Sequence, residues 1–318
     1  MSDSPAPRNG GDAEADLDVN ILRQALPYMR QHRGKTLVAK LGGHLVKDRV
    51  ALDYLAADLA LLHHIGMRVC VVHGGGPQAT ELQEKLGVEP QFVEGRRVTD
   101  DATLEVVKMV FAGKINLEML AALRGHGLRV VGLTGVSGGL IRARRREVRE
   151  MKDPVTGATR SVDFGHVGDI EGVDTSLLRV LMEAGYVPVV ASLGADEKGS
   201  ILNINADNVA LEMAVDLKAD KFLNLTQVPG VMRSLSDPDS LVTDLTAEEA
   251  EGLVRQGLVK GGMIPKVRTC VEAVKRGIPR AHILNGLEPH AILLELFTVR
   301  GTGTMITLKP EPPAPAVG

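Results

Sequence analysis

Two glycine-rich segments of the chain carry residue types that could bind a phosphate group. Lys40 stands just before Gly42 and Gly43, and His73 stands directly before the run Gly74–Gly76. A lysine supplies a point charge, and glycine lets backbone N–H donors approach an anion closely. Each segment alone could equally be a tight turn between a strand and a helix. Neither contains the G-x-x-x-x-G-K-[ST] or G-x-G-x-x-G fingerprint, which disfavours P-loop ATPases and simple dehydrogenases.

Two further segments place charged and amide side chains close to the predicted start of a helix. Asn203, Asn205 and Asp207 alternate along one stretch, as ligands at the end of a strand do. Lys266 follows a glycine pair, and a lysine near glycines at a helix start again suits a phosphate. Simpler interpretations stay open, because Asp207 could cap a helix and the Lys266 segment could be a solvated loop.

The segment around Ser137 offers a competing interpretation as a hydrolase. Gly135–Gly139 fits the G-x-S-x-G pattern of a nucleophile elbow, and His73–Gly76 matches the oxyanion segment of some esterases. An elbow joins a buried strand directly to a helix. Ser137 is instead followed by glycines and an Leu-Ile-Arg stretch that predicts a loop and then a strand, which disfavours the hydrolase.

The elements that must position these residues alternate between short strands and helices. Near-continuous apolar runs predict strands buried on both faces of a parallel sheet, namely Thr36–Lys40, Val69–His73, Arg129–Leu133, Val187–Ser192, Lys221–Leu225 and His282–Leu284. Helical patterns cover Val50–Ile65, Asp101–Gly113, Asn116–Gly125, Asp207–Lys218, Val267–Lys275 and a short N-terminal helix in Asn20–Gln31 that Pro27 would bend. We expect an α/β fold, an open three-layer αβα sandwich with a mainly parallel central sheet. Such sheets bind ligands at the carboxyl ends of their strands.

Length and composition limit the function classes. The 318 residues suffice for one large α/β domain or two ordinary ones, and 44% hydrophobic with 24% charged residues is typical of a globular protein. A net charge of −3, no Trp, three Tyr and five Phe disfavour nucleic-acid binding. Met1–Asp16 and Pro310–Gly318 have the composition of disordered tails, and Cys70 and Cys270 that of buried free thiols. No stretch reaches the roughly 18 apolar residues of a membrane span, so we expect a soluble cytoplasmic protein.

Taken in order, the motifs resemble those of the amino acid kinase family, and within it the enzymes that phosphorylate N-acetyl-L-glutamate. The resemblance covers about residues 20–307. The matching segments are KLGG (Lys40–Gly43), VVHGGGPQ (Val71–Gln78), FVEGRRVTD (Phe92–Asp100), MVFAGKIN (Met109–Asn116), NINAD (Asn203–Asp207), GGMIPK (Gly261–Lys266) and LLELFT…GTGTMI (Leu293–Ile306). The resemblance implies two lobes, with residues 35–218 binding the acyl substrate and residues 219–318 binding ATP. It also implies the reaction, in which ATP and N-acetyl-L-glutamate give N-acetyl-L-glutamyl 5-phosphate and ADP during arginine biosynthesis.

The resemblance also implies roles for individual residues. Lys40 and Lys266 would stabilise the transferring phosphoryl group, and Asp207 would orient both lysines. The residues implied for substrate binding are Gly74, Gly75, Arg97, Asn203 and Asn205. Those implied for ATP binding are Gly42, Gly43, Gln227, Gly230, Val231 and Met263. Mg²⁺ would be carried on the nucleotide, without a metal site built from protein side chains.

Four positions depart from the family pattern. Gln227 and Asn285 stand where the family usually has aspartate, Asn224 lies in a usually apolar strand, and His44 replaces a common asparagine. These changes concern nucleotide binding more than the phosphate-stabilising groups. Two alternatives stay open, namely a kinase for a homologous aminoadipate-type substrate of lysine biosynthesis and a non-catalytic arginine sensor. A pocket discriminates against one extra methylene by only about 1–3 kcal/mol.

The segment before the first predicted strand, residues 17–34, resembles the N-terminal helix of the arginine-inhibited, hexameric members of the family. Such helices interlace between dimers, so the resemblance implies a trimer of dimers. By position, L-arginine would bind to Tyr28, His282, Glu295, Gly301 and Gly303. Glu295 would pair with the guanidinium or α-ammonium group of arginine, although a helix-surface carboxylate would give the same pattern.

Overall fold

The computed structural model describes residue 23 and residues 25–152, 159–234, 237, 240–298 and 301–310. The predicted tail Met1–Asp16, the first residues of the predicted N-terminal helix and residues 311–318 lie outside this part of the chain. Within it, no helix is both long and apolar enough to span a bilayer.

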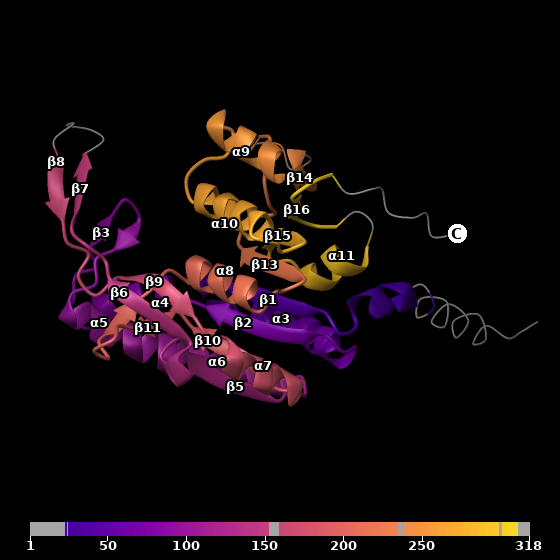
Figure 1. The fold of residues 1–318 in the computed structure, drawn as a ribbon, viewed down its shortest axis with the longest axis horizontal. Coiled ribbons are helices and arrows are strands. Elements are labelled where there is room, and N and C mark those ends of the chain that lie inside the picture. The colour runs from indigo at the N-terminus through magenta and orange to yellow at the C-terminus, as the bar shows by residue number, and fades with distance from the viewer. Residues whose placement is uncertain are drawn as a thin grey trace, which may run out of the picture.

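An eight-stranded, mainly parallel sheet forms the centre of the fold (Figure 1). Its strands in spatial order are β14 (Asp244–Thr246), β16 (Thr304–Thr307), β15 (Arg280–Asn285), β13 (Lys221–Thr226), β1 (Thr36–Leu41), β2 (Arg68–His73), β10 (Val187–Ala191) and β5 (Val130–Thr134). Within this sheet, only the neighbouring strands β15 and β16 run antiparallel to each other. All six predicted strands are confirmed to within two residues. The strands β14 and β16 are too short to form a recognisable apolar run.

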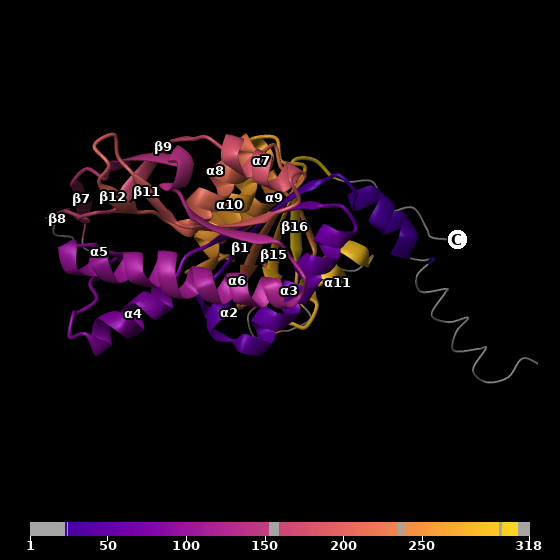
Figure 2. The ribbon, with the colours of Figure 1, turned by 90° about the horizontal axis from the view of Figure 1, so that it is seen from below.

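Helices pack on both faces of this sheet and bury two separate cores. On β1, Val38 points into one core, whereas Leu37 and Ala39 point into the other, because successive side chains of a strand alternate between faces. The helices of the first core are α7 (Ser176–Glu183), α8 (Ala206–Asp216), α9 (Ala247–Arg255) and α10 (Met263–Lys275). Those of the second include α2 (Gly43–Lys47), α3 (Arg49–His64), α4 (Gly76–Lys85), α6 (Asn116–Gly125) and α11 (Ala291–Phe297). Figure 2 shows these layers on opposite sides, so the predicted three-layer sandwich is confirmed.

A π-helix joins two of the predicted helices into one continuous run. The helix α5 (Asp101–Lys108) passes into the π-helix η1 (Met109–Ile115), which passes directly into α6. The predicted gap after Gly113 is therefore wrong, because the backbone crosses it in a wider turn and stays helical. The predicted start of α10 at Val267 is also late, since the helix begins at Met263 and includes Lys266.

A smaller sheet and two hairpins lie at one end of the molecule (Figure 1). The sheet comprises β12 (Ile201–Asn203), β11 (Leu193–Ala195), β6 (Ile141–Arg145) and β9 (Gly168–Val173). The hairpins pair β3 (Phe92–Val93) with β4 (Arg96–Arg97), and β7 (Arg149–Lys152) with β8 (Thr159–Val162). These strands are short, and several are rich in arginine, so hydrophobic patterning does not reveal them.

The structure disfavours Ser137 and the two cysteines as nucleophiles. Ser137 lies in the short 3₁₀ turn η2 (Ser137–Gly139), which leads into β6 and not into a helix, so it does not sit on a nucleophile elbow. Its hydroxyl accepts a hydrogen bond from the Thr134 amide at 3.0 Å. Cys70 and Cys270 are free and fully buried, as predicted. Burial raises the pKa of Cys70 to about 12, which keeps that thiol protonated and inert.

Candidate active site

Lys40, Asp207 and Lys266 converge at the carboxyl end of β1. Lys40 lies on β1, whereas Asp207 and Lys266 lie in the first turns of α8 and α10. One Asp207 carboxylate oxygen is 2.7 Å from Lys40 Nζ, and the other is 3.9 Å from Lys266 Nζ. The side chains of Lys40, Asp207 and Lys266 are only 8%, 13% and 21% exposed. Little water therefore screens the interaction among the three charges.

The two lysines keep Asp207 ionised. Burial raises the pKa of the Asp207 carboxyl, but the charges of Lys40 and Lys266 outweigh burial, and the net shift of its pKa is downward. Burial and the charge of Lys40 lower the pKa of Lys266, and Asp207 opposes part of this shift. The cluster carries one net positive charge in a partly desolvated place, which suits an anionic ligand.

Asn224 is the fourth member of this cluster. It pairs in register with Lys40 across the parallel strands β13 and β1 and is fully buried. Its side-chain amide donates to Asp207 Oδ1 over a long 3.4 Å, while its own Oδ1 has no hydrogen-bond partner. The sequence marks Asn224 only as a departure from the family pattern, because the contact with Asp207 depends on the register of the sheet.

The two glycine turns approach each other beside the lysines. The Gln78 side chain of α4 donates to the Gly43 carbonyl at 2.5 Å and so ties the second turn to the first. A Cβ on Gly43 would lie 2.8 Å from Gln78 Oε1, and a Cβ on Gly75 would lie 2.8 Å from Phe111 Cδ1. A side chain at either position would therefore force neighbouring side chains to shift. The amide of Gly42 donates to the Leu225 carbonyl at 3.3 Å, so a phosphate that uses this amide must compete with that carbonyl.

Three of the residues implied for substrate binding, Gly74, Gly75 and Arg97, lie at the start of α4 and in the hairpin β3–β4. Arg97 donates to the Gly76 carbonyl at 2.8 Å and to the Thr80 hydroxyl at 2.6 Å, and it also bonds the Gln83 side chain. Its guanidinium lies 4.8 Å from the centre of the Phe92 ring. These contacts hold Arg97 at the N-terminal end of α4, next to the second glycine turn.

Asn203 and Asn205 differ in what their side chains do. Asn203 donates to the Thr99 hydroxyl at 3.1 Å. Asn205 is the N-cap of α8, and its Oδ1 accepts from the amides of Asp207 and Asn208 at 2.8 and 3.2 Å. Asp207 is therefore not the helix cap, and its carboxylate is left for the lysines. The cap accounts for Asn205 without a substrate contact.

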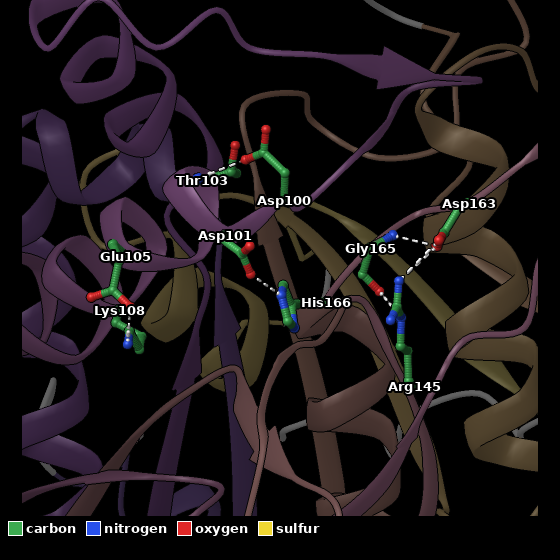
Figure 3. A network of polar contacts seen from close by, with 9 residues as sticks. All are labelled: Asp100, Asp101, Thr103, Glu105, Lys108, Arg145, Asp163, Gly165 and His166. Carbon is green, nitrogen blue, oxygen red and sulfur yellow. Dashed lines mark hydrogen bonds and ion pairs between the residues drawn. The ribbon is translucent and has the colours of Figure 1, made fainter.

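A network of polar contacts around Asp101, His166 and Arg145 lies beside the segments of Thr99 and Asn203, and Figure 3 shows its side chains. His166 contacts Asp101 at 2.7 Å, while its backbone amide donates to the Thr99 carbonyl at 2.6 Å and its carbonyl accepts from the Asn203 amide at 2.8 Å. Beside it, Arg145 bonds the Asp163 carboxylate at 2.9 Å. The network joins the segment after β4 to the segment before β9, and no sequence motif indicated it.

The residues implied for ATP binding fall into two groups. Met263 is half-buried and begins α10, one turn before Lys266. Gln227 is exposed just after β13. Gly230 and Val231 are buried, and the Val231 amide donates to the Thr304 hydroxyl at 2.8 Å. The structure thus places Met263 on the helix of Lys266 and packs Gly230 and Val231 against β16.

Three of the residues implied for arginine binding, His282, Gly301 and Gly303, surround the carboxylate of a fourth, Glu295. Glu295 accepts from the amides of Thr302 and Gly303 at 2.8 and 3.0 Å and contacts His282 at 2.7 Å. Gly301 lies so close that a Cβ there would be 2.6 Å from Glu295 Oε2. The Glu295 side chain is only 5% exposed, which contradicts the interpretation as a surface carboxylate. Burial raises the pKa of Glu295, but His282 and the two amides outweigh it and the net shift is downward.

The N-terminal helix packs against α11, the helix that carries Glu295. Residues 25–32 are helical, as predicted, and the Tyr28 ring lies 6.0 Å from the Phe297 ring. His32 of the same helix contacts the Leu296 carbonyl at 3.1 Å. The fifth residue of the implied arginine site, Tyr28, therefore lies on a helix that packs against α11, the helix of Glu295.

Buried polar atoms without partners mark the site as one that takes a polar ligand. Among the described residues only five such atoms occur, and two of them are Gln78 Oε1 and Asn224 Oδ1, beside Gly43 and Asp207. A third is Ser192 Oγ, which lies near Gly74. The same part of the chain contains no group of three or more His, Cys, Asp or Glu side chains placed to hold a metal ion.

Curated relatives at high coverage are acetylglutamate kinases. That of Methanothermobacter thermautotrophicus is 45% identical over 91% of this chain and 99% of its own length. That of Symbiobacterium thermophilum is 46% identical over 93% of this chain and 99% of its own length.

Solved structures share the fold. An N-acetylglutamate synthase from Neisseria gonorrhoeae, complexed with coenzyme A and N-acetyl-glutamate, matches with a TM-score of 0.77 and 32% identity over 92% of this chain. The match spans 64% of that synthase chain. The same synthase has also been solved with coenzyme A and L-arginine. A carbamate kinase from Giardia lamblia bound to AMP-PNP, at 19% identity and a TM-score of 0.59, supports the fold alone. The model of the amino acid kinase family matches residues 35–285, and the chain belongs to this family.

Proposed function

We propose that the chain transfers the γ-phosphoryl group of ATP to the side-chain carboxylate of N-acetyl-L-glutamate, the second step of arginine biosynthesis. The observation that carries this proposal is the cluster of Lys40, Asp207 and Lys266 beside two glycine turns at the carboxyl edge of the sheet. The full-length similarity to acetylglutamate kinases supports the choice of acceptor.

The geometry suits a reaction that needs positive charge and no general base. A carboxylate acceptor is already ionised at pH 7, so no proton has to be removed from it. The obstacle is repulsion between the acceptor and the phosphoryl group, and fixed cations lower this barrier. Lys40 and Lys266 supply that charge from two different elements. Asp207, held ionised by both lysines, orients them and takes no proton.

The other predicted site residues divide between the two substrates. The Gly74–Gly75 turn, Arg97 and Asn203 face the acyl substrate, which residues 35–218 bind. Gly42, Gly43 and Met263 lie toward the nucleotide, which residues 219–318 bind, and Gln227, Gly230 and Val231 are proposed for the same role. In support of this division, β13, β14, β15 and β16 all come from residues after 218 and form one half of the main sheet. Mg²⁺ would be held by the ATP phosphates and would supply charge neutralisation there, because both oxygens of the Asp207 carboxylate already face lysines.

L-Arginine is the proposed inhibitor, bound next to Glu295. Support comes from the clustering of His282, Glu295, Gly301 and Gly303, with Tyr28 on the adjoining helix. The synthase of known structure was solved with L-arginine, which fits an effector of this chemistry. The hexamer, built as a trimer of dimers through the N-terminal helices, and the cytoplasmic location stay predictions.

The test is an assay that traps the acyl phosphate with hydroxylamine in the presence of ATP and Mg²⁺. We expect hydroxamate from N-acetyl-L-glutamate, much less from the homologous N-acetyl-aminoadipate, and almost none from Lys266→Ala. L-Arginine should suppress the product in the unaltered chain and not in Glu295→Gln. Equal turnover of both acceptors would favour the aminoadipate alternative. Arginine binding without any hydroxamate would favour the sensor.

A further inference from the structure

His73, the last residue of β2, is bonded through both of its ring nitrogens. Nδ1 lies 2.9 Å from the Gly74 carbonyl oxygen, and Nε2 lies 3.0 Å from the side-chain amide nitrogen of Asn116. A carbonyl oxygen only accepts, so Nδ1 carries the proton, and Nε2 then accepts a hydrogen bond from Asn116. Both contacts therefore require the same neutral tautomer of His73.

The role of His73 is geometric and not that of an acid or a base. Its side chain is fully buried, and burial lowers its pKa to about 4, so the ring is neutral near pH 7. Its Nδ1–H donates to the Gly74 carbonyl, and its Nε2 accepts from the Asn116 side chain. What His73 can do is hold the peptide group that follows it.

That peptide group contains the amide donor of Gly75. In a trans peptide the C=O and the next N–H point in opposite directions. Because His73 holds the Gly74 carbonyl, the Gly75 N–H points away from the ring. No described residue accepts a hydrogen bond from this N–H, and Gly75 is the N-cap of α4. The donor is thus oriented and left open at a helix start, where an anion is stabilised.

The Asn116 side chain is buried and makes a second hydrogen bond besides the one to His73. It is 4% exposed, and its side-chain nitrogen also donates to the Val189 carbonyl of β10 at 3.1 Å. A hydrogen-bond chain therefore runs from β10 through Asn116 and His73 to the Gly74 carbonyl.

The π-helix η1 gives Asn116 its direction. It ends at Ile115, directly before Asn116, and its residues Phe111 and Ile115 pack against Gly75. A π turn holds one residue more than an α turn, so an α-helical path would rotate Asn116 by about 100° relative to α5. The π turn thus positions Phe111 and Ile115 against Gly75, and it also positions Asn116 to donate to His73. Such π segments occur frequently at functional sites.

We infer that Asn116 is a positioning residue for phosphoryl transfer, acting through His73 to orient the amide of Gly75 toward the transferring group or the acceptor carboxylate. The inference rests on the proposed function, which assigns Gly75 to the substrate. A purely structural Asn116, which only satisfies the Val189 carbonyl, is the competing account.

A double-mutant cycle separates the two accounts. Asn116→Leu removes the donor to His73, and His73→Asn removes the ring nitrogen that accepts from Asn116. Asn116→Leu should lower kcat by about tenfold to a hundredfold with each KM within about threefold, since the oriented donor acts mainly in the transition state. In the His73→Asn background the same substitution should change kcat by less than about threefold, because the pathway is already broken. Gln256→Leu, a similar change at the exposed C-cap of α9, should leave kcat unaltered.

A spectroscopic measurement tests the hydrogen-bond chain independently of turnover. ¹⁵N-histidine NMR of the unaltered chain should show His73 as the neutral Nδ1–H tautomer, and Asn116→Leu should shift or broaden that signal. The inference is overturned by an Nε2–H or charged His73, by equal kcat losses in both backgrounds, or by a loss confined to KM. Thermal unfolding of each variant shows whether it is folded, and a melted Asn116→Leu would be replaced by Asn116→Ser. No turnover in the unaltered chain would refute the proposed function and with it the catalytic role, while the NMR result would still decide the tautomer.

Discussion

Replacing Asp207 by asparagine tests whether its charge keeps Lys266 protonated. Asp207→Asn preserves the size of the side chain and removes a charge that lies 2.7 Å from Lys40 Nζ and 3.9 Å from Lys266 Nζ. Coulomb's law with an effective dielectric constant of about 20 gives about 4 kcal/mol for unit charges at the longer distance of 3.9 Å. Burial and Lys40 already lower the pKa of Lys266, so loss of Asp207 lowers it further.

The expected result is a change in the pH dependence of kcat. Lys266 stabilises the phosphoryl group only when protonated, so activity is present below its pKa and is lost as the pH rises through that pKa. In Asp207→Asn this loss should occur at lower pH than in the unaltered chain. One pH unit corresponds to about 1.4 kcal/mol, so even a third of the Coulomb energy moves the loss by about one unit.

The assay is hydroxamate formation at saturating substrates, measured from about pH 6 to pH 10. Asp53→Asn is the matched control, because Asp53 lies on α3, is 70% exposed and pairs with His126 and not with a site lysine. An unchanged kcat with an unchanged basic limb would refute the reasoning. If Asp207 were instead a general base, the variant would lose activity at every pH and its basic limb would not move.

Two further predictions concern the second glycine turn. Gly75→Ala should lower kcat by at least about tenfold, because the new Cβ would lie 2.8 Å from Phe111 Cδ1. Gly76→Ala should leave kcat unchanged, because its Cβ would meet nothing within 4 Å. Equal steady-state kcat values for the two variants would contradict this prediction. The free energy of unfolding should rise by up to about 3 kcal/mol from pH 4 to about 6.5. In this pH range the unfolded chain binds a proton on His73, whereas the native chain does not, because burial lowers the pKa of the native ring to about 4. Urea unfolding of His73→Asn should show a shallower rise, and an unaltered slope would count against the buried neutral ring.

The predictable part of the fold consists of the strands whose apolar runs are continuous. The strands β1 and β2 are buried along almost their whole length, so their residues have only one environment to match. In β6 only Ile141 and Ala143 are apolar among three arginines, an alternation too short to predict a strand. The π-helix could not be predicted either, because residues 109–115 have an ordinary helical pattern and their contact with Gly75 is a tertiary one.

The positions of the charged residues could be predicted, but their contacts could not. Strand ends and helix starts of a parallel sheet meet at one edge, which is enough to expect Lys40, Asp207 and Lys266 together. The partners of these residues depend on register and on tertiary packing. The motif suggested a substrate contact for Asn205, where the structure has a helix cap. Gln78 and Asn116 belong to matching segments, but the sequence assigned neither of them a contact.

Asn224 shows why a departure from a family pattern can be functional. An amide in an apolar strand reads as a weakening substitution until the register with β1 places it against Lys40 and Asp207. Its buried Oδ1 lacks a partner, and such an atom costs about 1–3 kcal/mol unless a donor reaches it. We expect a bound ligand to donate a hydrogen bond to Asn224 Oδ1 and so to offset this unfavourable free energy. Local departures of this kind concentrate at functional sites, where packing alone does not decide the residue.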